Sequence, residues 1–161
     1  MILPYVVYCS SGDMDAQYLL TISKYNGENN GKAEMTYYYQ EMQKLFPNST
    51  VFYSTKRDRH SVTVNDLTGN LWLDKKYYAS DCHKIDPIVD RIGRGDAFSG
   101  GISHGLLCQD DFQTITNFAT AAAVLKHTIY EDCNQLSISE VKSFLKSGTG
   151  KQTDKKVKDL F

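Results

Sequence analysis

The chain has 161 residues, of which 41% are hydrophobic and 23% are charged, and its formal net charge is −1. This length accommodates one domain with a buried core, and the composition excludes an intrinsically disordered chain. The near-neutral charge excludes a strong field that would recruit nucleic acid or anionic lipid, and no apolar run approaches the roughly 20 residues that span a membrane.

The first third of the chain predicts two helices, a loop and a strand. Residues 13–25 (DMDAQYLLTISKY) carry apolar side chains at helical spacing and predict a helix. Glycine and asparagine make residues 26–32 a predicted loop. Residues 34–46 predict a second helix, which Pro47 stops. Residues 50–55 (TVFYST) predict a short buried strand.

The sequence pattern changes in the middle of the chain. Short strand-like runs separated by turn residues predict an antiparallel meander over residues 61–80. Residues 97–108 then predict a helix that contains Gly100, Gly101 and Gly105. Each of these glycines costs the helix about 1 kcal/mol relative to alanine, so we expect another group to approach this helix closely.

The last third predicts two more helices and a tail. An alanine-rich helix over residues 112–127 is capped by Asp110 or Asp111. The sequence Ser137-Ile138-Ser139-Glu140 fits a capping box for a final helix that ends near Gly148. Residues 149–161 are polar and charged and predict a loose tail. Together the elements predict an α/β layer with an antiparallel extension.

Two further expectations concern the environment of the protein. The first residues, MILPYVVYCSSGDMD, lack a basic segment followed by a long apolar one, so we predict no secretory signal and a cytoplasmic protein. The four cysteines are widely scattered without a C-x-x-C spacing, and we predict free thiols.

The stretch DRIGRGDAFSGG, residues 90–101, packs four glycines around one acid, Asp96, at the start of a predicted helix. Unpaired N–H groups and the helix dipole favour anions there, and glycines let a ligand come near, so the segment predicts an anion hole for phosphate. Asp96 at its mouth is placed to accept a proton from a hydroxyl that attacks phosphorus. The alternative is a glycine-rich turn that Asp96 merely caps.

With its flanks, DPIVDRIGRGDAFSGGISHGLL closely resembles the C-terminal signature of ribokinase-like (PfkB-type) carbohydrate kinases. FATAAAVLKHTIYEDCN, YSTKRDRHSV and GNLWLDKKYY resemble the 2-keto-3-deoxygluconate kinases within that family. The resemblance covers roughly residues 2–148. It implies a ribokinase-like three-layer αβα sandwich, present as the C-terminal, nucleotide-binding portion over residues 1–148 with a small antiparallel β meander.

The resemblance also implies cofactors and site residues. The cofactors are ATP and Mg²⁺. Asp96 matches the catalytic base that deprotonates the sugar hydroxyl, and Gly93, Arg94 and Gly95 match the anion-hole loop. The remaining matches are nucleotide-binding positions: Ser54, Thr55 and Arg57 for the phosphates or ribose, and Thr120 and Ala123 for the adenine.

Three departures from the family pattern affect the expected function. Arg94 stands where the family usually has a small residue, so it either crowds the phosphate or binds it. SSGDMDA (10–16) lies where the family has an N-x-x-E motif; Gly12 replaces the asparagine, and Asp15 would stand in for the metal-binding glutamate. Family members also carry an N-terminal half that builds the sugar site, of which this chain has little.

Two functions therefore remain open. The first is ATP-dependent phosphoryl transfer to a hydroxyl of an acidic sugar, with the chain supplying the ATP-binding and catalytic half. The second is a catalytically inactive truncated paralogue that binds nucleotide or a partner. An uncovered sheet edge tends to pair with another chain, so we expect a homo-oligomer or a separately encoded N-terminal half, and neither nucleic acid nor membrane as a partner.

Other motifs have simpler explanations. Arg94-Gly95-Asp96 is the tripeptide that some adhesion receptors bind, but the missing signal peptide argues against adhesion. SGTGKQTD (147–154) lacks the glycine and hydroxyl residue that a phosphate-binding Walker A loop requires. TKRDRH (55–60) is either a solvated charged turn or a phosphate-binding segment.

Overall fold

The computed structural model describes residues 2–27 and 30–147. The predicted tail, residues 149–161, therefore lies outside the described residues. Two short helical turns occur near the N-terminus, η1 (Leu3–Tyr5) and η2 (Asp15–Leu19). The strands are β1 (Tyr8–Ser10), β2 (Val51–Arg59), β3 (Asn65–Leu73), β4 (Lys76–Ala79) and β5 (His83–Ile85), and the longer helices are α1 (Gly31–Leu45), α2 (Arg94–Cys108), α3 (Phe112–Lys126) and α4 (Ile138–Ser147).

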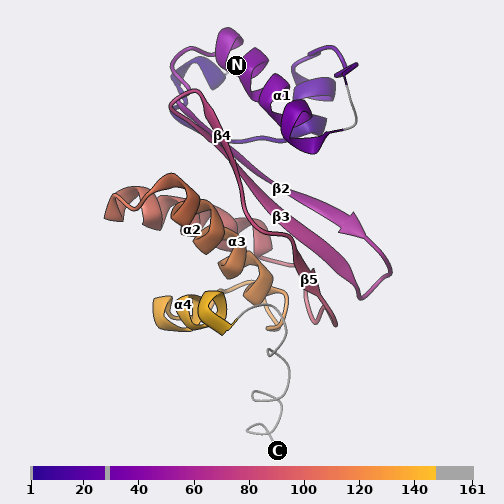
Figure 1. Ribbon diagram of the computed structural model, residues 1–161, viewed down its shortest axis with the longest axis vertical. Coiled ribbons are helices and arrows are strands. Elements are labelled where there is room, and N and C mark those ends of the chain that lie inside the picture. The colour runs from indigo at the N-terminus through magenta and orange to yellow at the C-terminus, as the bar shows by residue number, and fades with distance from the viewer. Residues whose placement is uncertain (1, 28–29, 148–161) are drawn as a thin grey trace, which may run out of the picture.

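These elements form three layers around a mixed sheet, as predicted. Helix α1 lies on one side of the sheet, and α2 and α3 lie on the other, with α4 packed against α3 (Figure 1). Within the described part of the chain, no helix is long and apolar enough to cross a bilayer.

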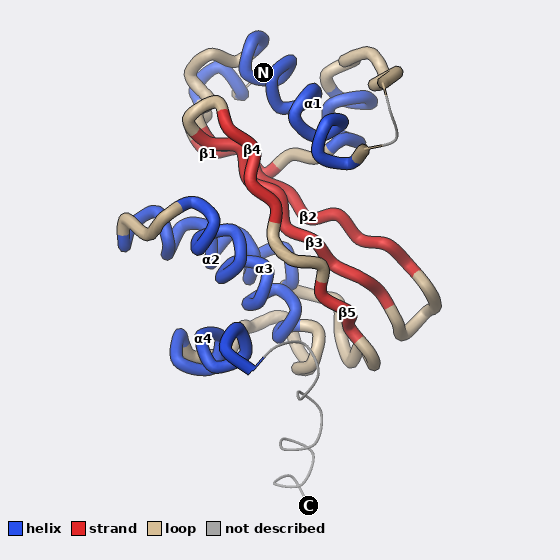
Figure 2. The backbone as a smooth tube through the Cα atoms, viewed as in Figure 1, coloured by secondary structure: helices blue, strands red, loops and turns tan. Residues whose placement is uncertain are grey.

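Strand β3 is the centre of the sheet (Figure 2). It pairs antiparallel with β2 along one side, and its other side pairs with β4 and then β5. Strand β1 runs parallel to β2, with Tyr8 opposite Val51, and its far edge pairs with no other strand among the described residues. The sheet is therefore open at β1.

Alternation along β2 divides the interior into two cores, because successive side chains of a strand point to opposite faces. Tyr53 contacts Phe98 of α2, with ring centroids 6.0 Å apart. Its neighbour Phe52 stacks on Tyr39 of α1, also at 6.0 Å. Trp72 of β3 belongs to the α1 core and is 2% exposed. Trp72 therefore has a packing role in this core.

Close packing of α2 on α3 explains two of the glycines in α2. A Cβ at Gly101 would lie 2.5 Å from Ala119 Cα, and one at Gly105 would lie 2.6 Å from Ile115 Cγ1. The group expected to approach this helix is therefore α3. Around Gly100, by contrast, a Cβ would meet nothing within 4 Å.

We predict that Gly101→Ala destabilises the fold by about 1–3 kcal/mol, because the added methyl group must push the α3 backbone away. The matched control is Gly100→Ala, which adds the same methyl group to open space and is expected to stabilise the helix by up to about 1 kcal/mol. Urea denaturation of both variants measures the difference. Equal stability of the two variants would contradict the packing argument.

The predicted elements are confirmed with shifted ends, apart from one helix. Instead of a helix over residues 13–25, a single turn ends at Leu19, because Thr21 adopts a left-handed φ of 55°. The spacing places Met14, Tyr18, Leu19 and Ile22 on one helix face. In the structure the first three are 60–74% exposed, and Ile22 is partly buried against the α1 core. Helix α2 begins at Arg94, three residues earlier than predicted.

Candidate functional site

The site is built on the N-terminus of α2. Gly93 caps the helix with a left-handed φ of 74°, and Ala97 N donates to Gly93 O at 2.9 Å. The side chain of Asp90 braces the approach by accepting from Ile92 N at 3.0 Å. Arg94, Gly95 and Asp96 consequently occupy the first turn, where backbone N–H groups have no partner within the helix. This end of α2 carries the positive pole of the helix dipole.

Asp96 lies beside a cavity of about 340 Å³ between α2, α3 and the segment that leads into α4. Its side chain is exposed. Gly93 and Gly100 line the same cavity from α2, while Asp132 and Asn134 line it from the following segment. A ligand in this cavity would therefore lie against both Asp96 and the capping glycine.

Three arginines near the first turn of α2 lie close enough for the charges of Arg57 and Arg91 to act on Arg94, and we call these three the arginine cluster: Arg57 of β2, Arg91 and Arg94. Burial lowers the pKa of Arg94, and the charges of Arg57 and Arg91 lower that pKa further. Arg91 Nη2 donates to Val62 O. The Arg91 Nε and Arg94 Nη1 atoms are buried and have no hydrogen-bond partner, and none of the ion pairs found among the described residues includes the cluster.

His127 adds an acceptor next to this cluster. The side chain is fully buried, and its Nδ1 lies 2.7 Å from Ala123 O, so Nδ1 carries the proton and donates. Burial lowers the pKa of His127, although the Ala123 hydrogen bond opposes this, and the three arginine charges lower the pKa further. His127 is therefore a neutral imidazole, and its Nε2 has no described partner.

This arrangement fits an anion. Buried guanidinium donors without acceptors are costly unless a ligand satisfies them, and guanidinium groups match phosphate geometry. The first-turn N–H groups add further donors. ATP phosphates therefore suit the residues present.

The described residues provide fewer ligands for Mg²⁺ than donors for phosphate. Residues 2–27 and 30–147 contain no group of three or more His, Cys, Asp or Glu side chains placed to hold a metal ion. Asp15 Oδ2 instead accepts from Gly12 N at 2.9 Å. Because Mg²⁺ usually binds through one or two carboxylates together with phosphate oxygens, the described residues would share such an ion with the phosphates of a bound nucleotide rather than hold it alone.

The residues predicted on β2 fall on both faces of the sheet. Arg57 shares the α2 face with Tyr53, and alternation places Thr55 there too. Ser54 points to the opposite face, where its Oγ lies 2.7 Å from the Tyr39 hydroxyl and accepts from Asn70 Nδ2 at 3.2 Å. Arg57 therefore lies on the same face of the sheet as α2 and the rest of the arginine cluster, and Ser54 lies on the other face.

The two residues predicted to border the adenine lie inside the core. Thr120 and Ala123 are 0% exposed, and Thr120 Oγ1 donates to Thr116 O at 2.8 Å. The cavity beside Asp96 is lined instead by Phe118 and Ala122, which lie on an adjacent part of α3. Contacts of Thr120 and Ala123 with adenine stay a prediction.

Sequence reasoning gave no role to Arg91, His127 or Lys126. Arg91 lies three residues before Arg94 in the DRIGRGD motif. This short spacing in the sequence was a signal that Arg91 also belongs to the site. The position of His127 depends on how the end of α3 meets the segment before α2, where Val89 N and Asp90 N donate to His127 O, and no sequence spacing indicates that contact.

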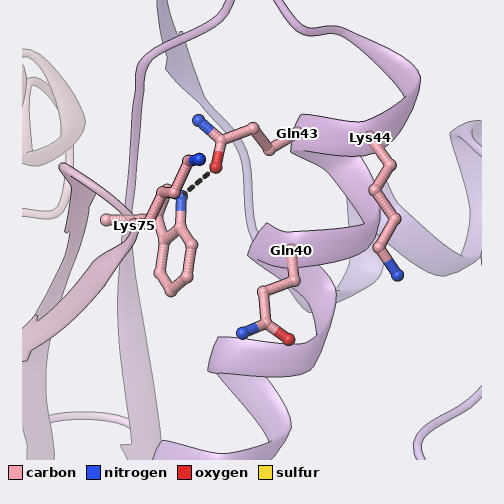
Figure 3. A pocket seen from close by; sticks show the side chains of 5 residues that line it. Gln40, Gln43, Lys44 and Lys75 are labelled. Carbon is pink, nitrogen blue, oxygen red and sulfur yellow. Dashed lines mark hydrogen bonds between the residues drawn. The ribbon is translucent and has the colours of Figure 1, made fainter.

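A second cavity, of about 280 Å³, lies on the α1 side of the sheet (Figure 3). Gln43 Oε1 accepts from Trp72 Nε1 at 3.0 Å, and Gln40, Lys44 and Lys75 complete the lining. None of the predicted site residues lines this second cavity, whereas Gly93 and Asp96 line the cavity next to α2. We therefore treat the α2 site as the functional candidate.

No protein-family model and no curated protein matches the sequence. Solved structures do match it. A PfkB family carbohydrate kinase from Listeria grayi is 38% identical, with a TM-score of 0.79 over 89% of this chain and 42% of that one. The 2-dehydro-3-deoxygluconokinase of Thermotoga maritima is 33% identical, with a TM-score of 0.82 over 91% of this chain and 43% of that one.

A putative 2-keto-3-deoxygluconate kinase from Enterococcus faecalis is 30% identical, with a TM-score of 0.80 over 90% of this chain and 42% of that one. The chain thus spans less than half the length of each of these proteins. A nucleoside kinase of Burkholderia thailandensis, at 15% identity and a TM-score of 0.61, shares the fold alone.

Proposed function

The chain corresponds in sequence and ribokinase-like fold to about 42% of the length of PfkB-family carbohydrate kinases, and from this premise we propose that it is the ATP-binding and catalytic part of a sugar kinase. The observation that carries the proposal is the pair of buried guanidinium atoms without partners, Arg91 Nε and Arg94 Nη1, next to the helix turn that bears Asp96. The proposed reaction is phosphoryl transfer from ATP to a hydroxyl of an acidic sugar of the 2-keto-3-deoxygluconate type.

In the proposed mechanism, the arginine cluster and the first-turn N–H groups of α2 hold the phosphate oxygens. Asp96 accepts the proton of the sugar hydroxyl as its oxygen bonds to the γ-phosphorus, while the bond from that phosphorus to the β,γ-bridging oxygen breaks and ADP leaves. Mg²⁺ bound to the phosphates would neutralise charge during the transfer. Positioning both substrates provides most of the remaining acceleration.

The second candidate is a nucleotide- or partner-binding module without catalysis. It is favoured by apolar side chains exposed near the open β1 edge, which include Tyr8, Tyr18 and Leu19 at 59–74% exposure. Exposed apolar surface of this kind marks interaction sites. A second copy of the chain or a separate N-terminal half would cover it, in a cytoplasmic assembly.

The test is titration calorimetry of the purified chain with Mg·ATP. We expect binding in the micromolar range, and we expect Arg94→Gln to weaken it about tenfold or more, because a charged hydrogen bond to phosphate is lost. The control is Arg59→Gln, which removes an exposed arginine from the same strand as Arg57. Undetectable binding by the unmodified chain would overturn the proposal, and equal affinities of both variants would remove Arg94 from the site.

A further inference from the structure

Lys126, the last residue of α3, is a buried cation that the proposed mechanism does not use. Its side chain is 0% exposed. The ammonium donates to Ile129 O at 3.3 Å and to Glu131 O at 2.5 Å. None of the salt bridges found in the described part of the chain includes Lys126. A buried ammonium held by backbone carbonyls has lost its water, so its hydrogen bonds must be maintained for the fold to tolerate it.

The carbonyls that Lys126 holds belong to a turn, residues 129–132, that touches the cap of α2. A Cβ built on Gly93 would lie 2.2 Å from Asp132 O and 3.2 Å from Lys126 Cε. The bare Cα of Gly93 is therefore packed against both the turn and the stem of the lysine side chain.

The segment leading to α2 is fastened to the same place. Val89 N and Asp90 N both donate to His127 O, at 2.8 and 3.2 Å. The charge of Lys126 is also close enough to Asp90 to contribute to the lowered pKa of that carboxyl, whose main cause is the Ile92 hydrogen bond. Residues 89–93 and 126–132 thus form one junction with the Lys126 ammonium inside it.

We propose that Lys126 is a positioning residue for the anion site: its ammonium fixes the 129–132 turn as the surface against which Gly93 caps α2. The turn sets where the cap sits, and the cap sets the direction of the first-turn N–H groups and of Asp96. The same turn brings Asp132 to the wall of the cavity. The expected effect of Lys126 on ligand binding rests on the proposed function, whereas its expected effect on the structure of the junction does not.

The experiment compares Lys126→Met, which keeps an apolar stem and removes the ammonium, with Lys142→Met, which removes an exposed lysine from α4. Hydrogen–deuterium exchange is measured without nucleotide. In Lys126→Met we expect exchange over residues 89–97 and 129–134 to rise about 10- to 100-fold, as for loss of hydrogen bonds from a charged donor. Exchange over β3 should match that of the unmodified protein.

Unchanged exchange over residues 89–97, or an equal rise throughout β3, would overturn the proposal, the second because it indicates general destabilisation. A chemical rescue separates charge from packing. Lys126→Ala should regain protection in propylammonium chloride, and equal rescue by propan-1-ol would show that only volume matters. If Lys126→Met does not fold, the same exchange comparison is made with Lys126→Gln, whose amide retains a donor for one carbonyl.

Mg·ATP calorimetry on the same proteins links the junction to the site, and Lys126→Met should bind ATP about tenfold or more weakly than Lys142→Met does. Equal affinity of the two variants would show that the junction does not position the site. If the unmodified chain binds no ATP, the proposed function fails while the exchange result still decides the role of Lys126.

Discussion

Asp96→Asn is expected to reduce phosphoryl transfer by about 10²- to 10⁴-fold, the usual contribution of a positioned general base. Asparagine keeps the size and the helix position of the side chain but cannot take the proton of the attacking hydroxyl. Because Asp96 is exposed in the first turn of α2, the substitution should leave folding and ATP affinity nearly unchanged. The measurement is kcat with Mg·ATP and 2-keto-3-deoxygluconate, in an assembly of this chain that turns over.

The matched control for this prediction is Asp110→Asn. Asp110 is also exposed and lies between α2 and α3, away from the residues that line the cavity. The control removes the same charge without touching the proposed site. Equal turnover by the two variants would remove Asp96 from the mechanism, and a matching loss of ATP affinity in Asp96→Asn would indicate a role in binding instead.

Gly93→Ala is expected to lower the free energy of unfolding by about 2–4 kcal/mol, which combines the cost of a left-handed alanine with overpacking. The φ of Gly93 is 74°, and the new Cβ would lie 2.2 Å from the backbone oxygen of Asp132. Neither the helix cap nor the 129–132 turn can keep its place. Any variant protein that still folds should therefore also lose ATP affinity.

Urea denaturation and calorimetry test this prediction, with Gly95→Ala as the control for folding. A Cβ at Gly95 would have no atom within 4 Å, so its stability should stay within about 0.5 kcal/mol of the unmodified protein. If Gly93→Ala were as stable as Gly95→Ala, the cap would not be under the constraint that its geometry indicates.

The features that could be predicted from sequence were local ones. Gly93 and Asp96 stand at the start of a helix as expected, since a glycine cap and first-turn acid are encoded by neighbouring residues. The capping box is also confirmed: Ser137 N donates to Glu140 Oε2 at 2.9 Å. Strand β5 was missed because three residues paired with β3 give no periodicity to read.

The features that could not be predicted depend on distant contacts. The apolar spacing of residues 13–25 suited a helix, but the chain turns at Thr21, which leaves Met14 and Tyr18 exposed while Ile22 packs against the α1 core. The predicted strand ended at residue 55, whereas β2 continues to Arg59, so the alternation that separates Ser54 from Arg57 became apparent only in the structure. Lys126 and His127 acquire their neighbours only when α3 meets the loop before α2, so their environment is a tertiary property.

The arginine cluster has a consequence for how fast the protein is degraded by proteases. The three arginine charges repel one another, and the buried Arg91 Nε and Arg94 Nη1 atoms have no hydrogen-bond partner, so a bound anion would relieve both costs. A ligand that binds only the folded state stabilises it by about 2.7 kcal/mol at one hundred times its dissociation constant. Proteolysis that acts on the unfolded chain would slow accordingly. If the proposed anionic ligand binds, the cellular abundance of this protein would follow the supply of that ligand, and scarcity of the ligand would shorten the half-life of the protein.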